Sequence, residues 1–273
     1  MNSPIAVHSR LPQGNVMALA QPTGAEAGRS MISDLLRLMG ADDPDAHDAP
    51  SIPIPMRRVR AGETLFHEGA HAESIYFVRS GTFKIFRTAE DGYEQVLGFA
   101  GRTEVLGFDA VSSDGHPTEA IALEDCSLYV LPMPDLFVLA EKCPVLGRVV
   151  HLAVSDALAR QHELADVMAA VAAEVRLSRF LLQLSQRMAA SGRSPRRFVL
   201  RMNRRDIASY LGVAHETVSR SFTALAGWRL VDVDNREVAI TDMDGLRALS
   251  LGTRRQIDEA SRRCLVHPAA HVA

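Results

Sequence analysis

The stretch from Asn203 to Gly227 constrains the fold more than any other part of the chain, because it encodes a helix, a tight turn and a second helix. Ala208, Gly212 and Val218 stand where such a motif needs a small contact residue, a turn residue and a buried branched residue. Glycine adopts a left-handed turn conformation at little steric cost. The pattern therefore predicts a helix-turn-helix, whose second helix offers one face to the major groove of DNA.

The second predicted helix has one polar and one apolar face. Spacings of three and four residues place Glu216, Ser219 and Arg220 on the same side. Arg220 can contact guanine with two hydrogen bonds, Glu216 can accept one from a cytosine amine, and Ser219 can meet a thymine. The alternative is that Glu216 and Arg220 form only a surface ion pair, worth less than about 1 kcal/mol.

Basic residues gather around this motif. Between Arg193 and Arg220, seven arginines stand against two acidic residues, whereas the whole chain has a formal net charge of −3. A local basic patch on a nearly neutral protein attracts phosphates without making the rest of the surface adhesive. We therefore expect a further group of residues to contact DNA, mainly at its phosphates: Arg196, Arg197, Arg204, Arg205, His215 and Thr217. The alternative is that these are solvent-exposed residues with no part in DNA binding.

Upstream of this region, short apolar runs alternate with glycines from residue 52 to about residue 132. Runs of this length, with turns every eight to twelve residues, indicate an antiparallel sandwich or roll. The expected strands cover residues 64–66, 74–78, 83–86, 95–99 and 127–131.

A long helical pattern begins at Pro144. Its seam residues step by three and four positions, as in a coiled coil, and are Val150, Val154, Leu158, Gln161, Ala165 and Met168. Continued to about residue 175, the helix would be roughly 45–50 Å long, too long to bury against one small domain. A partner helix from a second copy is the simplest cover for the seam, and a helix folded onto its own sheet domain is the alternative.

The fold class is thus α+β, with five segments. Residues 1–50 are expected to be a flexible arm with one short helix near 32–39, residues 51–143 a β-roll, and residues 144–175 the dimerisation helix. Residues 176–252 would form a winged helix-turn-helix, with a hairpin over 230–240 as the wing. Residues 253–273 would be a loosely held tail.

Several other classes of protein find no support in the sequence. No run of about twenty apolar residues predicts a membrane span, and the first residues do not resemble a signal peptide. The three cysteines are scattered, which favours a reducing cytoplasm. Neither a nucleophile–base pair nor a phosphate loop indicates an enzyme, and His8, His47, His67 and His71 make no convincing metal set.

The order of glycine-rich sheet domain, long helix and winged helix-turn-helix resembles the CRP/FNR superfamily of bacterial transcription regulators. Residues 61–69 and 75–81 look like the opening strands of that family, and residues 107–110, 116–117, 122–124, 194–198 and 215–220 are similar to its FNR branch. The resemblance runs from about residue 57 to 249. It implies a homodimer that binds double-stranded DNA at an inverted repeat of TTGAT-like half-sites.

The resemblance also implies contact with RNA polymerase through the acidic loop that holds Asp91, Gly92 and Glu94. A plain hairpin tip is the alternative reading of this loop. Activators of the family touch polymerase through such exposed loops, so the resemblance favours an activator.

Known effectors of the family do not suit this chain. The branch that binds cyclic nucleotides holds the phosphate with an arginine, but Pro117 stands at that position and Glu119 adds negative charge. Oxygen-sensing members hold a four-iron cluster with four cysteines, three of them in the N-terminal arm. Residues 1–50 contain no cysteine, Tyr129 stands at the sheet position, and Cys126 is displaced from it by three residues. Because the chain departs from both patterns of the family, we expect it to bind no cofactor.

Gln161 occupies the seam position at which oxygen sensors of this branch carry an acidic residue that opposes dimerisation. A neutral side chain removes that repulsion. We therefore expect a constitutive dimer, as in FixK-like members, although Gln161 could instead fix the register of the two helices. A small-molecule effector of the sheet domain, or a redox role for Cys126 or Cys264, is the alternative means of control.

Overall fold

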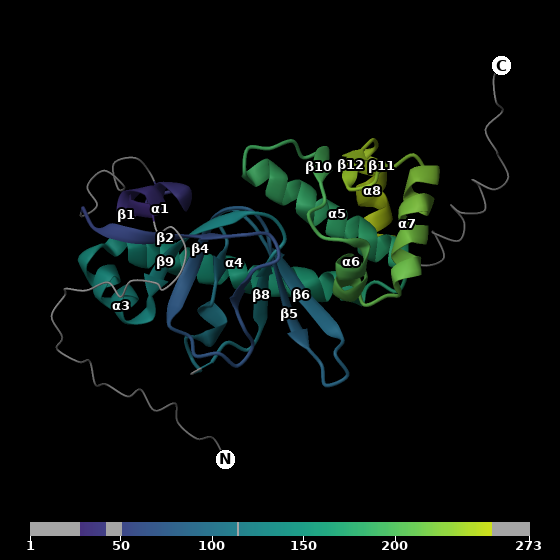
Figure 1. Cartoon of the computed structure of the whole chain (residues 1–273). Helices are drawn as coiled ribbons and strands as arrows, with labels where there is room; N and C mark the ends of the chain where they lie inside the picture. Colours follow the sequence, from purple (N-terminus) through teal and green to yellow (C-terminus); the bar gives the residue numbers. More distant parts are fainter. Residues whose placement is uncertain (1–27, 42–50, 114, 253–273) are drawn as a thin grey trace, which may run out of the picture.

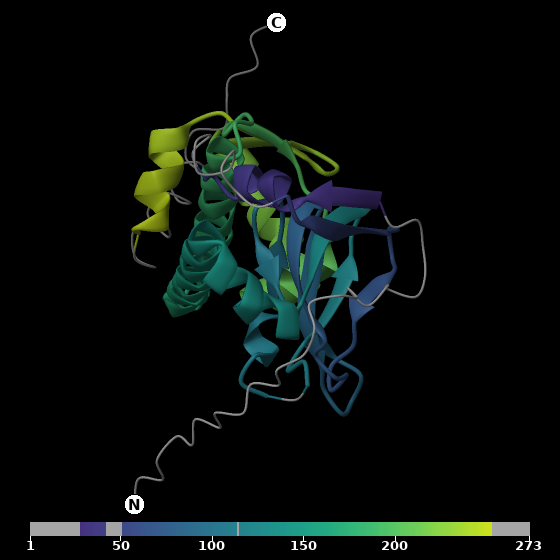
Figure 2. The same ribbon diagram turned by 90° about the vertical axis from the view of Figure 1, so that its left-hand side faces the viewer.

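The computed structural model describes residues 28–41, 51–113 and 115–252. Figure 1 shows a β-roll domain and a helical domain, with the long helix α4 running from one to the other. Figure 2, turned by 90°, shows the helices lying beside the strands. The expected α+β architecture is confirmed.

Two antiparallel sheets form the β-roll. One has the strand order β1-β2-β9-β4-β7 and the other β3-β8-β5-β6. Their bounds are β1 Gly28–Met31, β2 Pro53–Val59, β3 Thr64–Phe66, β4 Ser74–Ser80, β5 Phe83–Thr88, β6 Glu94–Ala100, β7 Val105–Leu106, β8 Glu119–Ala122 and β9 Cys126–Pro132. A short 3-10 helix, η1 (Phe108–Ala110), follows β7. Apolar side chains from both sheets, such as Leu128 and Phe83, share one buried cluster.

All five expected strands are present, and four more strands were not predicted. β2 contains two prolines, which weaken a strand signal, and β7 and β8 are short. β1 lies in the expected arm.

Part of the expected N-terminal arm is folded: the short helix expected near residues 32–39 is present, whereas the strand before it, over Gly28–Met31, was not predicted. β1 pairs with β2, and α1 (Ile32–Leu38) buries Ile32, Leu35 and Leu36 completely. These side chains pack with α3 (Met133–Lys142) and with the start of α4 in one apolar cluster. The rest of the expected arm, and the expected tail over 253–273, lie outside the described residues.

The helix that begins at Pro144 is shorter than expected. α4 spans Pro144–Ala169, and a second helix, α5, spans Ala173–Ala190. The extended backbone at Ala170 and Ala172 interrupts the helical hydrogen bonding. Arg176 braces this break, since its guanidinium donates to the carbonyl oxygens of Ala170 and Leu211, both at 2.7 Å.

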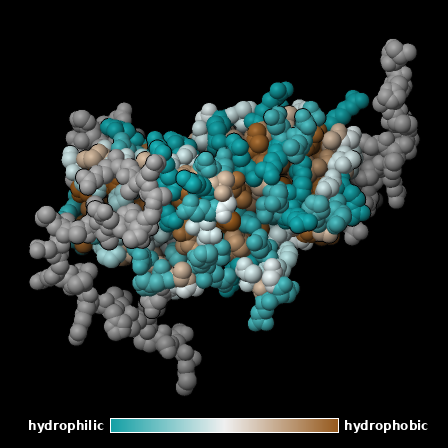
Figure 3. All heavy atoms as spheres, in the orientation of Figure 1, coloured by the Kyte–Doolittle hydropathy of each residue, from teal (hydrophilic) through white to brown (hydrophobic). Residues whose placement is uncertain are grey.

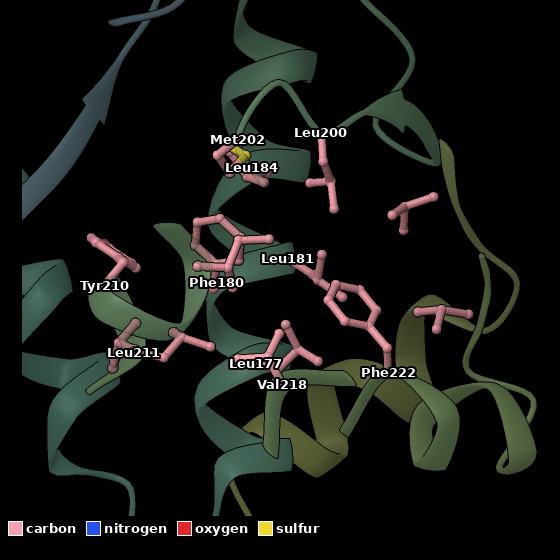
Figure 4. Packing of buried hydrophobic residues seen from close by; sticks show 14 of the residues in the cluster. Leu177, Phe180, Leu181, Leu184, Leu200, Met202, Tyr210, Leu211, Val218 and Phe222 are labelled. Carbon is pink, nitrogen blue, oxygen red and sulfur yellow. The ribbon is translucent and has the colours of Figure 1, made fainter. Parts of the chain in front are cut away.

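The helical domain is a winged helix-turn-helix. It consists of α5, α6 (Arg204–Leu211), α7 (His215–Gly227), α8 (Met243–Ser250) and a three-stranded sheet. The expected wing is present as β11 (Val231–Asp234) and β12 (Glu237–Ile240), and a third strand, β10 (Arg197–Val199), pairs with β12. Figure 4 shows side chains of α5, α6 and α7 gathered in the core of this domain, among them Leu177, Leu211 and Phe222.

This core does not stop at the domain boundary. Phe86, Val96 and Phe99 of the β-roll belong to the same buried cluster as Phe180 and Tyr210 of the helical domain.

On the face shown in Figure 3, hydrophilic residues cover most of the surface and hydrophobic residues emerge in smaller areas between them. None of the described helices is both long and apolar enough to cross a membrane.

Candidate nucleic-acid interface

The turn between α6 and α7 has the geometry that the sequence predicted. Gly212 adopts a left-handed conformation (φ 61°, ψ 42°) directly after α6. At the other end of α6, the Asn203 side chain accepts from the Asp206 backbone N–H, and the Asp206 carboxylate accepts from that of Asn203. This reciprocal pair satisfies two helix-end donors and defines where α6 begins.

α7 presents the predicted reading face to solvent. Glu216, Ser219 and Arg220 are all exposed. On the other side of the helix, Val218 and Phe222 are at most 4% exposed and are held in the core. Burial of the apolar side therefore turns the carboxylate, the hydroxyl and the guanidinium outward, as direct readout of bases requires. In Figure 1, α7 lies at the edge of the molecule farthest from the β-roll.

Two neighbouring arginines at the start of α6 have different surroundings. Arg205 is exposed. The Arg204 guanidinium lies 3.6 Å from the centre of the Phe222 ring and donates to the Asn235 carbonyl oxygen at 3.1 Å. Burial lowers the pKa of Arg204, and one of its nitrogens is buried without a hydrogen-bond partner. Arg204 therefore braces the recognition helix against the wing.

The other predicted phosphate contacts also differ among themselves. Arg196 and His215 are exposed, and His215 is the first residue of α7. Arg197 is exposed on β10, but it lines a surface groove with the acidic residues Asp232, Asp234 and Glu237. That negative surrounding does not favour a phosphate next to Arg197.

Sequence reasoning missed Thr223 and Arg236 as candidate DNA contacts. Thr223 is exposed one turn beyond Ser219 and donates to the Ser219 carbonyl oxygen at 3.1 Å. Arg236 is exposed at the tip of the wing. The i, i+4 spacing from Ser219 would have found the first, and the position of Arg236 between two predicted strands the second.

The predicted seam lies along one side of α4. Leu158 is 55% exposed and Met168 is 41% exposed, Gln161 and Ala165 are exposed, and Val150 and Val154 are half-buried. The buried residues of α4 are Leu146, Val149, Ala153 and Val167, which pack within the same chain. An apolar strip on a long helix thus stays open beside the face that the chain itself covers. The Met168 methyl group also lies close to the turn after α6, since a Cβ added to Gly212 would lie only 2.7 Å from it.

A cavity of about 430 Å³ lies between the β-roll and α4. Gln161 and Arg160 of α4 line it on one side, and Asp109 and Thr118 line it on the β-roll side. Thr118 donates to the Asp109 carboxylate at 3.2 Å, and the neighbouring Pro117 is exposed. The β-roll wall of the cavity therefore carries a carboxylate, whereas two arginines, Arg160 and Arg187, line it from the helices α4 and α5.

The two cysteines among the described residues are both buried and unpaired. Cys126 and Cys143 belong to different apolar clusters, and the third cysteine, Cys264, lies outside the described residues. Burial raises the pKa of the Cys126 thiol to about 11, so the reactive thiolate is scarce at neutral pH. Tyr129, at the family position of the sheet cysteine, is itself 3% exposed. This donor set does not fit an iron–sulfur cluster.

Metal binding finds no further support. Within residues 28–41, 51–113 and 115–252, no group of three or more histidine, cysteine or acidic side chains could hold an ion. His67 is paired with Glu119 at 3.4 Å, and His8 and His47 lie outside the described residues.

A winged helix-turn-helix with an exposed polar reading face, attached through a long helix to a β-roll, defines a sensor-type DNA-binding regulator. Comparison with family models agrees: residues 56–143 match the cyclic nucleotide-binding domain, and residues 175–249 match the Crp-like helix-turn-helix domain.

Known proteins match about seven tenths of the chain. The transcriptional regulatory protein btr of Bordetella pertussis is 36% identical over 192 residues, which cover 70% of this chain and 79% of that protein. The fumarate and nitrate reduction regulatory protein of Escherichia coli is 35% identical over 196 residues, which cover 72% of this chain and 78% of that protein. The solved structure of FixK2 from Bradyrhizobium japonicum superposes with a TM-score of 0.65 at 25% identity, covering 73% of this chain and 98% of that one. The chain belongs to the CRP/FNR family of transcription regulators, on the FNR-like side.

The different surroundings of the two arginines lead to a prediction about stability. Arg204→Ala should lower the free energy of unfolding by about 1–2 kcal/mol, because it removes a cation–π contact and a hydrogen bond inside the domain. Arg205→Ala, the matched control, should change it by less than about 0.5 kcal/mol, as exposed substitutions usually do. Thermal and denaturant unfolding of both variants measure the difference. Equal stability of the two variants would contradict the bracing role of Arg204.

Proposed function

We propose that this regulator acts in the cytoplasm as a homodimer that binds an inverted repeat of TTGAT-like half-sites and activates transcription by contacting RNA polymerase. The observation that carries the proposal is the exposed row of Glu216, Ser219 and Arg220 on a helix whose opposite side is core. Two such helices related by two-fold symmetry match an inverted repeat.

Within each half-site, Arg220 is proposed to read a guanine, Glu216 a cytosine amine and Ser219 a thymine. An arginine–guanine pair of this kind discriminates by about 1–3 kcal/mol against the wrong base. Thr217 lies beside these residues, and its hydroxyl accepts from the Arg220 guanidinium at 3.3 Å. This contact supports an orienting role for Thr217 in addition to a DNA contact.

Phosphate contacts are assigned to exposed groups. Arg205 and His215 are proposed to bind the DNA backbone directly, and the open N-terminus of α7 supports an anion beside His215. Arg204 contributes through its packing on Phe222. Arg197 is the weakest candidate of the set, because of its acidic neighbours.

The dimer is proposed to form along the α4 seam and to need no cofactor. Open apolar side chains at Leu158 and Met168 support this pairing, and a neutral Gln161 places no charge repulsion in it. Cyclic nucleotides are not proposed as effectors, because Pro117 stands at the position of the family's phosphate-binding arginine and the β-roll wall of the cavity carries Asp109. The cavity volume supports a second candidate, control by a small ligand bound between the β-roll and α4.

The hairpin tip between β5 and β6 is proposed to touch RNA polymerase. Asp91 and Gly92 are exposed there, and an Asp91 carboxylate oxygen accepts from the Tyr93 backbone N–H at 2.9 Å. Glu94 is different, since its carboxylate lies 2.6 Å from the buried Lys84 ammonium group. Only the tip is therefore free for a partner, while Glu94 is also part of the internal structure.

The base-reading assignment predicts a change in specificity. Arg220→Ala should abolish specific binding and relax the preference at one guanine position, a loss of about 1–3 kcal/mol. Arg205→Ala should weaken binding to all sequences alike and reduce the slope of log affinity against log salt by about one. Gel shifts on matched and mutated half-sites measure both effects. Equal loss on every sequence from Arg220→Ala would defeat the assignment.

The seam assignment predicts the oligomeric state. The protein should sediment as a dimer both in air and without oxygen, and Leu158→Glu should give a monomer, because it buries a charge at the seam. Leu152→Glu is the matched control, since Leu152 is equally exposed on α4 but lies outside the seam. A monomer in air that dimerises without oxygen would refute the constitutive dimer.

Asp91 and Glu94 of the hairpin should differ in their effects on transcription and on DNA binding. Asp91→Asn keeps the acceptor oxygen of the turn and removes the charge, so transcription should fall several-fold while DNA affinity stays unchanged. Glu94→Gln should lower both, because Glu94 pairs with Lys84 next to the helix-turn-helix. A parallel fall of DNA affinity and transcription in Asp91→Asn would show that the loop is structural.

A further inference from the structure

The outer edge of the β-roll is closed by the first helix of the helix-turn-helix. β6 is the last strand of its sheet, so the outward N–H and C=O groups of this strand have no strand partner there. The Ser209 hydroxyl of α6 fills that place, since it donates to the Glu94 carbonyl oxygen at 2.7 Å and accepts from the Val96 N–H at 2.8 Å. One hydroxyl thus joins α6 to the backbone of the sheet.

A buried ion pair lies beside this contact. The Lys84 ammonium group of β5 lies 3.3 Å from the Asp206 carboxylate of α6, and both side chains are less than 10% exposed. The other oxygen of Asp206 accepts from the Asn203 N–H and so closes the start of α6. Removal of Lys84 would leave a buried carboxylate without its cation, which is strongly unfavourable. The same carboxylate therefore begins the helix and fastens it to the sheet.

Aromatic packing continues the junction inward. The ring centres of Phe99 and Tyr210 lie 5.5 Å apart, and that of Phe180 lies 5.3 Å from Tyr210. Arg187 of α5 donates to the Phe99 carbonyl oxygen at 3.1 Å. Domains of one chain move against each other by default unless their interface is large and apolar. Here the break between α4 and α5 would permit such motion, and the junction opposes it.

The docked arrangement leaves the reading face of α7 open, because Glu216, Ser219 and Arg220 are exposed while α6 is bound to β6. The contact therefore orients the helix-turn-helix instead of hiding it. We propose that the β5–β6 hairpin fixes the angle between each helix-turn-helix and α4, and thereby the half-site spacing that the dimer accepts. Lys84 and Ser209 are positioning residues in this proposal, which rests on the proposed binding to an inverted repeat.

Spacing is sensitive to such an angle. The two reading helices of a dimer must enter successive major grooves about 34–36 Å apart. When both engage together, the second contact is intramolecular and can raise affinity by about 10²-fold or more, and this gain disappears if the geometry forbids joint binding. A loosened hairpin contact should lower the gain at the best spacing and make other spacings more acceptable.

The test measures the affinity of full-length protein for inverted repeats whose spacer is changed by one or two base pairs, and for a single half-site. The variants are Lys84→Met and Ser209→Ala. Arg87→Met is the matched control, because Arg87 lies on the same strand but pairs with the exposed Glu68 within the β-roll. Wild type and control should bind the repeat with the best spacer about tenfold or more tightly than repeats with other spacers. Both variants should keep their affinity for a single half-site, but their preference for that spacer should fall below about threefold.

Unchanged spacer preference in Lys84→Met and Ser209→Ala would overturn the proposal. So would a parallel loss of half-site affinity in both variants, because that result would locate the damage in the reading helix itself. Wild-type protein that binds inverted repeats no better than a half-site would refute the proposed dimer site instead. If that happens, digestion with a protease that cuts after alanine and valine still tests whether Lys84 and Ser209 hold the helix-turn-helix in position. Faster cleavage at residues 170–172 in the variants supports it, and an unchanged rate overturns it.

Discussion

The position of the recognition helix depends on one hydrophobic core that crosses from the β-roll into the helix-turn-helix. Phe86, Val96 and Phe99 supply the sheet side of this core, and Phe180 and Tyr210 supply the helical side. Because apolar burial is the largest favourable term in folding, separating the two domains would expose these rings to water. The buried pair of Lys84 and Asp206 adds direction to a contact that apolar packing alone leaves free to slide.

The DNA-reading chemistry is a consequence of how the helical domain buries its side chains. α7 has one apolar side, and its burial decides which residues face outward. Arg204 shows that charge alone does not identify a DNA contact, since its guanidinium lies on the Phe222 ring while the neighbouring Arg205 is exposed. An arginine that stacks inside a domain in this way holds in place the helix that carries the residues proposed to read DNA.

The β-roll keeps the shape of a ligand-binding domain, but its polar groups differ from those that known effectors of the family require. Asp109 and Thr118 bond to each other at the wall of the cavity, and Cys126 is a buried thiol with a raised pKa. These groups neither attract a cyclic phosphate nor supply cluster thiolates. The domain also contributes the edge strand to which α6 is fixed, and this contact is made by the chain's own residues.

Local patterns were sufficient for much of this protein. The spacing within residues 203–227 predicted both helices, the left-handed Gly212 and the exposed Glu216, Ser219 and Arg220, because helix periodicity determines which side chains share a face. The alternation around Asp234 to Arg236 predicted the wing in the same way. Such features depend on residues within one or two turns of each other. Weaker signals were not sufficient: β2 was missed because two prolines interrupt its pattern, and β1 was missed because it lies in a segment expected to be part of an arm.

Only the tertiary structure decided what distant residues do together. Lys84 and Asp206 are 122 positions apart, and Val96 and Ser209 are 113 apart, so no local pattern connects them. The break of the long helix after Ala169, the internal role of Arg204 and the closing of the β6 edge by α6 also follow from packing between segments. The reason is physical: periodicity reports which face of an element is apolar, whereas its partner is chosen by the shape and charge of surfaces that form only when the chain has folded.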